Sequence, residues 1–331
     1  MTKRHIRLGL LLILWLAACA APISPTPTPD LDPVTQTLAS LKRIADHPLY
    51  VIHYTGNYPN TIGQSQAAQN AWGCSLFAAL GDPENMIYGR NFDWEHSPAL
   101  VLYTTPDDGY ASISLVNLGF LGFDKDEAEN LLTLPRKQQE TLLHTPFVPI
   151  DGMNEEGLVV GMAAVNDSWH DPDPAKPTIG SLAIMRELLD HARTVDEAIA
   201  LFEQYNIDFT GGPPVHYLIA DANGNAVLVE FVQGERILIP NNAPWHAATN
   251  FLLATAGDDP RNACPRYRAI DESLTLTEGR LDTADALALL QTVSQPDSTQ
   301  WSVVYDLSDK IVSIILDRIE TQVYTFTFDD R

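Results

Sequence analysis

Short apolar runs separated by tight turns dominate this chain, and the pattern favours antiparallel sheets. The clearest pair of runs, 215–220 and 226–231, flanks Asn223-Gly224, a dipeptide typical of two-residue hairpin turns. Two more hairpins are expected from their β-branched and aromatic content, 75–79 with 86–91 and 100–104 with 111–116. Single strands are expected at 49–54, 157–165, 301–305, 311–316 and 322–328.

Helices are expected in fewer places, where apolar residues recur with helical spacing. Thr194 with Glu197 three residues later is a capping-box pattern that starts one of them. The predicted helices are 37–43, 124–143, 181–193, 194–202 and 285–293. Strands, then helices, then more strands predict a layered α+β fold, and neither a dinucleotide-binding nor a phosphate-binding glycine motif is present in the sequence.

The first 35 residues have the composition of an export signal and a tether. A basic start and a short apolar run end in Leu16-Ala17-Ala18-Cys19, which resembles a bacterial lipobox with Cys19 as the lipidated residue. Residues 1–19 are therefore expected to be a lipoprotein signal peptide and 20–35 a proline-rich tether, with the folded part starting near Gln36. An ordinary signal peptide with a chance cysteine is the alternative. The expected location is the cell envelope, by a lipid anchor, or the outside of the cell after processing.

The charge balance limits the partners. Asp and Glu number 43 against 20 Lys and Arg, which gives a formal net charge of -23. Such a chain is not expected to bind nucleic acid, and it is expected to reach a membrane only through the anchor on Cys19.

A cysteine followed at fixed distances by an arginine and an aspartate is the motif with the most chemical content. Gly73-Cys74-Ser75 precedes the segment GRNFDW, which places Arg90 sixteen and Asp93 nineteen residues after Cys74. This register resembles the choloylglycine hydrolase and penicillin V acylase group, and it is similar to the isopenicillin N acyltransferase-like linear amidases. The resemblance extends from residue 74 to about residue 316.

The resemblance implies a fold and a set of site residues. The fold is the four-layer αββα arrangement of the N-terminal nucleophile hydrolases, two packed antiparallel sheets between helices. Cys74 is the implied nucleophile, and Arg90 and Asp93 complete its surroundings. Segments that resemble later family motifs add three residues: Asn166 as an oxyanion-binding asparagine, Asn250 as a second asparagine and Arg266 as a late arginine.

General chemistry agrees with this assignment. A cysteine attacks as thiolate, and the free thiol has a pKa of about 8.5. An α-amine, with a pKa of roughly 7.7–8.0, can act as the base when the cysteine is the first residue of its chain. Because 73 residues precede Cys74, internal cleavage at Gly73-Cys74 is required, by an N→S acyl shift and hydrolysis. Residues 36–73 are then a propeptide that dissociates or stays bound, and 74–331 are the catalytic domain.

Each of these residues also has a purely structural interpretation. Cys74 could be a small buried side chain, Arg90 with Asp93 a strand-end salt bridge, and the asparagines ordinary turn residues. Cys264 is expected to be a buried, inert thiol. The spacing of histidines and cysteines predicts no metal site, and no cofactor is expected.

The sequence thus predicts an enzyme that hydrolyses a small linear N-acyl amide through a Cys74 thioester. Acyl transfer to an amine is the close alternative, and a non-enzymatic ligand-binding surface lipoprotein is the distant one. Bile salts, β-lactams, acyl homoserine lactones and N-acyl amino acids or ethanolamines all remain open as substrates.

Overall fold

Two antiparallel-rich sheets form the centre of the fold, as seen in the computed structural model. The structure describes residues 31–58, 73–95, 98–319 and 322–331. The signal peptide, Cys19 and most of the tether lie outside these residues. Asp32–Arg331 form one compact unit.

Sheet A has nine strands, in the order β1-β2-β5-β6-β7-β8-β11-β12-β13. All neighbours are antiparallel except β2 and β5, which run parallel. The strands are β1 (Lys42–Ala45), β2 (Leu49–Tyr54), β5 (Ala99–Thr104), β6 (Ser112–Asn117), β7 (Pro149–Asn154), β8 (Val159–Ala164), β11 (Val215–Ala220), β12 (Ala226–Val232) and β13 (Glu235–Pro240).

Sheet B has six strands, in the order β14-β3-β4-β15-β16-β17. Strands β3 and β11, and β3 and β8, contact each other, so the two sheets pack face to face. The strands are β14 (Trp245–Ala248), β3 (Gly73–Ala79), β4 (Ile87–Asp93), β15 (Thr299–Asp306), β16 (Ile311–Leu316) and β17 (Val323–Thr327). A small parallel pair, β9 (Thr178–Gly180) and β10 (Asn206–Asp208), lies apart from both sheets.

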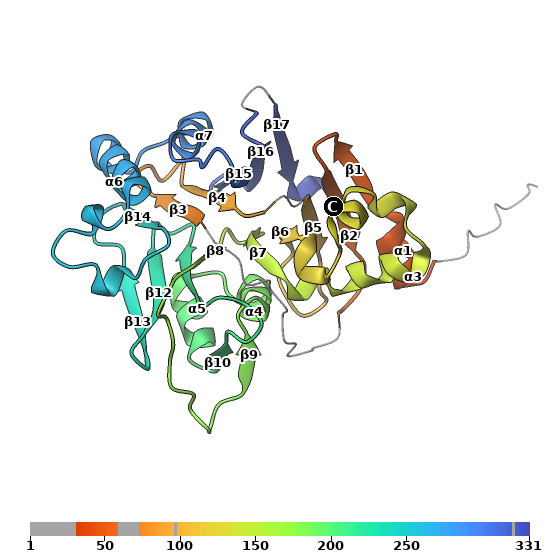
Figure 1. The fold of residues 1–331 in the computed structure, drawn as a ribbon, viewed down its shortest axis with the longest axis horizontal. Helices are drawn as coiled ribbons and strands as arrows, with labels where there is room; N and C mark the ends of the chain where they lie inside the picture. The colour runs from red at the N-terminus through yellow and green to blue at the C-terminus, as the bar shows by residue number, and fades with distance from the viewer. Residues whose placement is uncertain (1–30, 59–72, 96–97, 320–321) are drawn as a thin grey trace, which may run out of the picture. The chain divides into compact units, whose positions relative to one another are not determined.

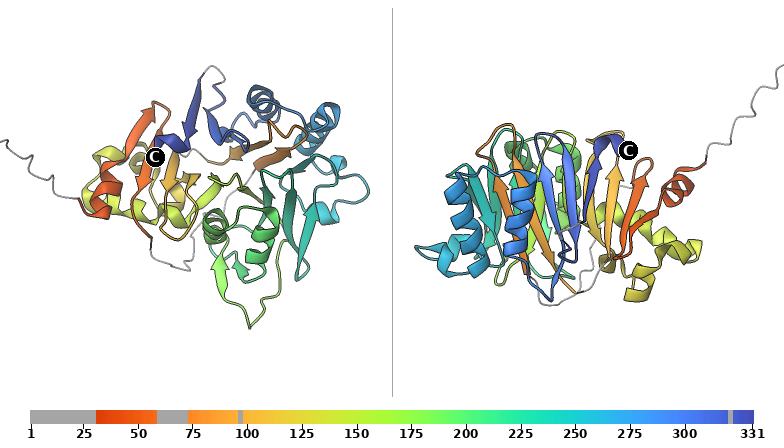
Figure 2. Two further views of the ribbon diagram at one scale, coloured as in Figure 1. Left: turned by 180° about the vertical axis from the view of Figure 1, so that it is seen from behind. Right: turned by 90° about the horizontal axis from the view of Figure 1, so that it is seen from above.

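Helices cover the outer face of each sheet. Helices α4 (Ala183–His191) and α5 (Val195–Phe202) pack on sheet A, and α6 (Pro265–Thr277) and α7 (Thr283–Thr292) pack on sheet B. Figure 1 and the two views of Figure 2 show the resulting order of helices, sheet, sheet and helices. The predicted αββα fold is confirmed.

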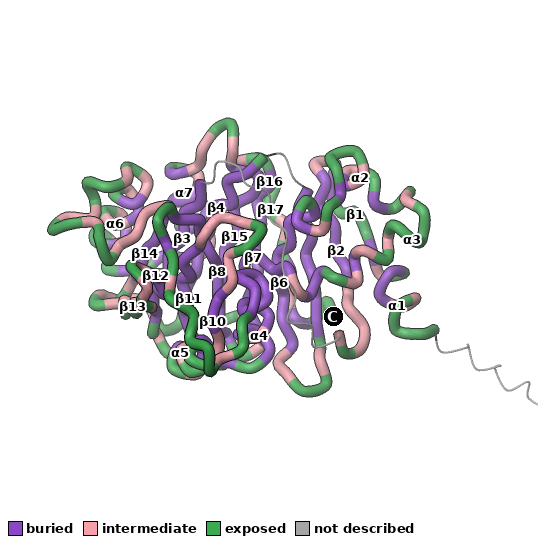
Figure 3. Tube along the Cα trace, turned by 60° about the horizontal axis from the view of Figure 1, so that its bottom comes forward, coloured by how far each residue is buried: buried purple, intermediate pink, exposed green. Residues whose placement is uncertain are grey.

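Alternation along the strands builds two cores, because successive side chains of a strand point to opposite faces. In β3, Cys74, Leu76 and Ala78 belong to the core between the sheets, while Phe77 and Ala79 belong to the core under α6 and α7. Both strands at the candidate site, β3 and β4, are buried throughout, as the purple tube in Figure 3 shows.

Two expectations about the first half of the chain were wrong. The predicted helix at 37–43 is instead α1 (Pro33–Ala39) followed by β1, because Asp32 accepts a hydrogen bond from the Thr35 amide and so starts the helix early. Folded structure therefore begins before Gln36, inside the predicted tether.

The predicted helix at 124–143 is broken into α2 (Lys125–Glu129), α3 (Arg136–Gln139) and 3₁₀ turns. Pro135, which has no N–H and disfavours helix in the residue before it, stands between the two helices.

Candidate active site

The antiparallel pairing of β3 with β4 brings the predicted cysteine, arginine and aspartate together. Gly73 pairs with Asp93, and Leu76 pairs with Arg90. The side chains of Cys74 and Arg90 lie on the face of sheet B that meets sheet A. Asp93 lies at the other face, beside Gly73. The fixed spacing in the sequence is therefore the register of one hairpin.

Arg90 connects the cysteine to sheet A. Its Nη2 donates to the Cys74 Sγ at 3.6 Å, and its Nη1 donates to the Ile150 carbonyl at 3.0 Å and forms an ion pair with Asp151. Burial alone would lower the pKa of Arg90, but the charges of Asp151 and Cys74 hold that pKa above the ordinary arginine value. The predicted alternative of an Arg90–Asp93 salt bridge is wrong, because the carboxylate paired with Arg90 is that of Asp151.

Asp93 is fixed by hydrogen bonds from Thr299, the first residue of β15, and from Gln295 shortly before that strand. The Gln295 Nε2 donates to Asp93 Oδ2 at 2.6 Å, and the Thr299 hydroxyl donates to Oδ1. The Arg266 Nη1 is 3.8 Å from Oδ2. Burial raises the pKa of Asp93, and these hydrogen bonds and the charges of Arg266 and Arg90 oppose that rise.

Asn250 and Arg266 hold the backbone of Cys74. Strand β14 ends at Ala248, opposite Leu76, so Cys74 has no backbone partner on that side. The Asn250 Oδ1 accepts instead from the Cys74 amide at 2.7 Å, and its Nδ2 donates to the Ala164 carbonyl at 2.8 Å.

Arg266, in the first turn of α6, ties the same groups together. Its Nη2 donates to the Asn250 Oδ1 at 2.8 Å, and its Nη1 donates to the Cys74 carbonyl at 2.5 Å and to the Ser75 hydroxyl at 2.9 Å. The structure thus brings five of the six predicted site residues together.

Asn166 is the exception. It is exposed just after β8, and among the described residues it makes no hydrogen bond to Cys74. Its neighbour Asp167 has a φ of 59°, in the left-handed region. Only its position two residues beyond Ala164, which binds Asn250, relates Asn166 to the site.

Two buried acids were missed by the sequence analysis. Asp151 pairs with Arg90 and accepts from the Tyr305 hydroxyl. Glu230 accepts from the amides of Leu253 and Ala254, at 2.8 and 2.9 Å, and so anchors the loop that follows Asn250. Both stand among apolar residues of a strand, and a charge in such a place is rarely buried without a partner. An acidic residue within an apolar strand segment is therefore the sequence feature that could have identified Asp151 and Glu230.

The remaining sequence predictions concern thiols, metals and membranes. Cys74 and Cys264 are both free thiols, and Cys264 is partly exposed rather than buried as expected. Within the described ranges, no cluster of three or more His, Cys, Asp or Glu side chains is arranged to hold a metal. None of the helices in this part of the chain has the length and apolar character needed to span a membrane.

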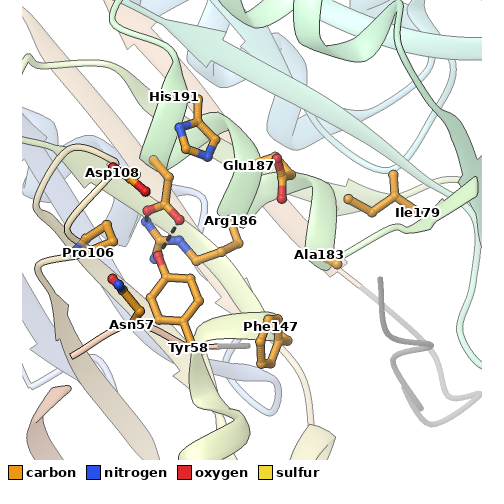
Figure 4. A pocket seen from close by; sticks show the side chains of 11 residues that line it. Asn57, Tyr58, Pro106, Asp108, Phe147, Ile179, Ala183, Arg186, Glu187 and His191 are labelled. Atoms are coloured by element: carbon orange, nitrogen blue, oxygen red, sulfur yellow. Dashed lines mark hydrogen bonds and ion pairs between the residues drawn. The ribbon is translucent and has the colours of Figure 1, made fainter. Parts of the chain in front are cut away.

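A cavity of about 230 Å³ lies away from these residues, between α4 and the turn that joins β5 to β6. The Tyr58 hydroxyl donates to the Asp190 carboxylate, which also pairs with Arg186 at 2.6 Å. Figure 4 shows Tyr58 and Arg186 beside each other in the lining of this cavity. Tyr58 follows β2, so this cluster joins the segment before Cys74 to a helix of the part after it.

Comparisons with known proteins agree with the fold described above. The structure matches the penicillin V acylase from Agrobacterium tumefaciens with a TM-score of 0.53 and 17% identity, over 77% of this chain and 86% of that one. It matches a cysteine-to-alanine variant of the conjugated bile acid hydrolase from Clostridium perfringens with a TM-score of 0.56 and 15% identity, over 78% of this chain and 93% of that one. These similarities show an N-terminal nucleophile hydrolase fold.

Sequence comparison then gives the family. The model of the acyl-coenzyme A:6-aminopenicillanic acid acyl-transferase family matches residues 144–320, more than half of the chain, and the protein belongs to this family. An uncharacterized protein of Paramecium bursaria Chlorella virus 1 is 30% identical over 109 residues, which cover 30% of this chain and 39% of that protein. The predicted family resemblance is confirmed, and the chain spans about 39% of the length of the viral relative.

Proposed function

We propose that the protein is a self-processing cysteine amidase that hydrolyses linear N-acyl amides through a thioester on Cys74. The observation that supports this most directly is the convergence of hydrogen bonds on one residue. The Sγ of Cys74 receives a hydrogen bond from Arg90, its amide donates to Asn250, and its carbonyl accepts from Arg266. A cysteine that served only to fill the core would not need this set of charged and polar partners.

Processing begins in the intact chain. The Cys74 Sγ attacks the Gly73 carbonyl carbon, the C–N bond breaks, and the Cys74 nitrogen takes up the proton to become an amine. Water then hydrolyses the thioester, which releases the Gly73 carboxylate and regenerates the thiol. Arg90 favours the thiolate by its fixed charge. Asp93, beside Gly73, is placed to hold the new amine, whose nitrogen is already bound by Asn250.

Turnover repeats these steps on a substrate. The amine of Cys74 accepts the thiol proton, Sγ forms a thioester with the acyl carbon, and the substrate amine leaves with that proton. Oxyanion stabilisation is assigned to asparagine side chains: Asn250, which must turn its Nδ2 away from Ala164, and Asn166, which must move toward Cys74. A positioned donor of this kind contributes roughly 3–4 kcal/mol to the transition state.

The segment before the cleavage site is proposed to remain bound after processing. Strand β2 lies inside sheet A between β1 and β5, and Leu49 and Ile52 are fully buried there. Tyr58 adds the contacts with Asp190 and Arg186. If Cys19 carries lipid as proposed from the sequence, the retained segment would keep the catalytic chain at the envelope.

Acyl transfer to an amine is the second candidate, because the family whose model matches carries an acyl-transferase name. Both reactions share the thioester, and they differ in whether water or an amine resolves it. We expect processed protein given an N-acyl amide to release mainly free acid, with an added amine diverting a minority of the product. Chromatography of the products with and without the amine tests this expectation. Mainly transferred product would establish the transferase, and no turnover by processed protein would favour a ligand-binding role.

A further inference from the structure

Gln295 occupies the space directly beside the residue that is cleaved. A Cβ added to Gly73 would lie 2.1 Å from the Gln295 Nε2 and 3.1 Å from its amide carbon. Such an approach is far inside van der Waals contact, so any side chain at position 73 would have to displace Gln295.

A glutamine side chain is flexible and can move, but moving Gln295 breaks a hydrogen bond to Asp93. The same side-chain Nε2 donates to Asp93 Oδ2 at 2.6 Å, and the backbone amide of Gln295 donates to the Thr299 hydroxyl at 2.7 Å. Thr299 in turn donates to the other oxygen of Asp93. A substituent on the Gly73 α-carbon therefore breaks a hydrogen bond that fixes the Asp93 carboxylate.

The α-carbon of Gly73 also marks the position of a substrate atom. In the processing thioester, the acyl carbon on Sγ is the Gly73 carbonyl carbon, and the next atom is the Gly73 α-carbon. In the turnover thioester, the corresponding atom is the α-carbon of the substrate's acyl group. Gln295 is thus in contact with the same position in both reactions.

We propose that Gln295 is a specificity-determining residue that selects an unbranched CH₂ or glycine α-carbon next to the reacting carbonyl. This inference rests on the proposed function and names its substrate class, amides of acids without an α-substituent. Because the crowded side corresponds to the Cβ of an L-residue, the exclusion is stereospecific. The enantiomer that places its α-methyl group at the position of this Cβ is rejected. The opposite enantiomer is better tolerated.

The Gln295 side chain separates Gly73 from a neighbouring cavity. Gln295 also lines an open cavity of about 490 Å³, together with Pro265, Arg266 and the exposed Asp297. Shortening Gln295 to alanine would join this space to the position beside the acyl α-carbon. The variant is therefore expected to accept what the original protein rejects.

The first test uses processing of the full chain, which needs no added substrate. Gly73→Ala is expected to slow cleavage at residue 74 by roughly 10- to 100-fold, the range for forcing an extra methyl group into a filled space. Combining it with Gln295→Ala should make cleavage faster than in Gly73→Ala alone, because the alanine frees the space that the added Cβ needs. Combining it with Asp297→Ala, on the same segment, should not. Normal cleavage of Gly73→Ala, or no rescue by Gln295→Ala, would overturn the proposal.

The second test uses processed protein and three amides with a chromogenic amine: hexanoyl and the two enantiomers of 2-methylhexanoyl. One enantiomer places its methyl group where the Cβ of an L-residue at position 73 would lie. We expect kcat/KM for this enantiomer to be at least about tenfold below that of its mirror image. The Gln295→Ala variant should remove this difference. Equal values for the enantiomers in the original protein would overturn the assignment. No turnover of any of the three would contradict the proposed function, and the processing test would still decide the role of Gln295.

Discussion

Arg90 and Asp151 form a buried ion pair. The proposed chemistry uses the charge of Arg90 beside Cys74, so the fold has to bury both charged side chains. Their side chains are 1% and 0% exposed. Removing one partner of such a pair leaves the other charge uncompensated, at a cost of about 3–5 kcal/mol, whereas replacing both with apolar residues costs much less.

We therefore expect Asp151→Leu, in an unprocessed Cys74→Ala background, to lose about 3–5 kcal/mol of unfolding free energy. The double variant Arg90→Met with Asp151→Leu should lose considerably less. Denaturant unfolding of the background protein, of Asp151→Leu, of Arg90→Met and of the double variant measures the difference. A double variant that is as unstable as the sum of the single changes would show that the two side chains do not act as a pair.

Asp93 sets an expectation for pH. Burial raises its pKa above the ordinary value of 3.8, and we propose that its ionised form binds the Cys74 nitrogen during processing. Protonation of Asp93 therefore reduces processing at a pH above that expected for an ordinary aspartate. The contribution of Asp93 to stability has the opposite slope, because a raised pKa favours the native state at low pH and this advantage is lost as pH rises through it.

The measurement is the rate at which the full chain disappears as a function of pH. An acid limb that lies above 3.8, and that moves to higher pH in Gln295→Ala because a hydrogen bond to the carboxylate is lost, agrees with this role. The charges facing Asp93 from other positions, Arg266 and Arg90, are unchanged in that variant. A limb at the ordinary carboxylate value would show that Asp93 does not control the step.

At the residue scale, the sequence predicted the part of the site that lies in local register. Cys74, Arg90 and Asp93 belong to one hairpin, so their spacing is a direct consequence of strand pairing. Gln295 and Thr299 reach the site from more than 200 residues away, in a segment with no composition signal of its own. Asn166 was predicted from a motif resemblance, but the structure leaves its side chain exposed just after β8. A motif gives the position of a residue in the chain, and it does not fix the orientation of a side chain that follows the end of a strand.

At the scale of elements, strands bounded by strong turns were predicted well. The hairpin at Asn223-Gly224 and the pairs β3–β4 and β5–β6 appear as expected. Strand β7, with proline and glycine among its six residues, was missed because its pairing comes from tertiary contacts rather than from propensity. Helix α6 was missed for a different reason: only Tyr267, Ile270 and Leu274 are buried among its residues, so the apolar pattern of the helix is weak.

Strand β2 makes the retained segment testable as an element. Ile52 is buried in sheet A, whereas Ile44 on the adjacent β1 is 45% exposed. After processing, the two chains are expected to co-elute in gel filtration, and Ile52→Ala should lower the urea concentration that separates them. A buried Ile-to-Ala change costs about 2–5 kcal/mol. Ile44→Ala is the matched control. Separation of the chains without denaturant would show that the segment is released.

At the scale of the whole molecule, two sheets with different roles meet at the candidate site. Sheet B contributes the strand of Cys74, the proposed nucleophile, while sheet A contributes Asp151 and, through Glu230, the support of the Asn250 loop. The proposed cleavage site lies where the chain enters sheet B, and the two strands described before it, β1 and β2, belong to sheet A. Cleavage at Gly73-Cys74 would therefore divide one folded unit without dividing its core.

The most direct test of the proposed function is the intact mass and N-terminal sequence of the purified protein. We predict a large chain that starts at Cys74, together with a smaller chain that ends at Gly73. The Cys74→Ala variant is expected to remain uncleaved while it folds normally. An active protein whose chain runs uncut through residues 70–80 would contradict the proposal that Cys74 acts as an N-terminal nucleophile.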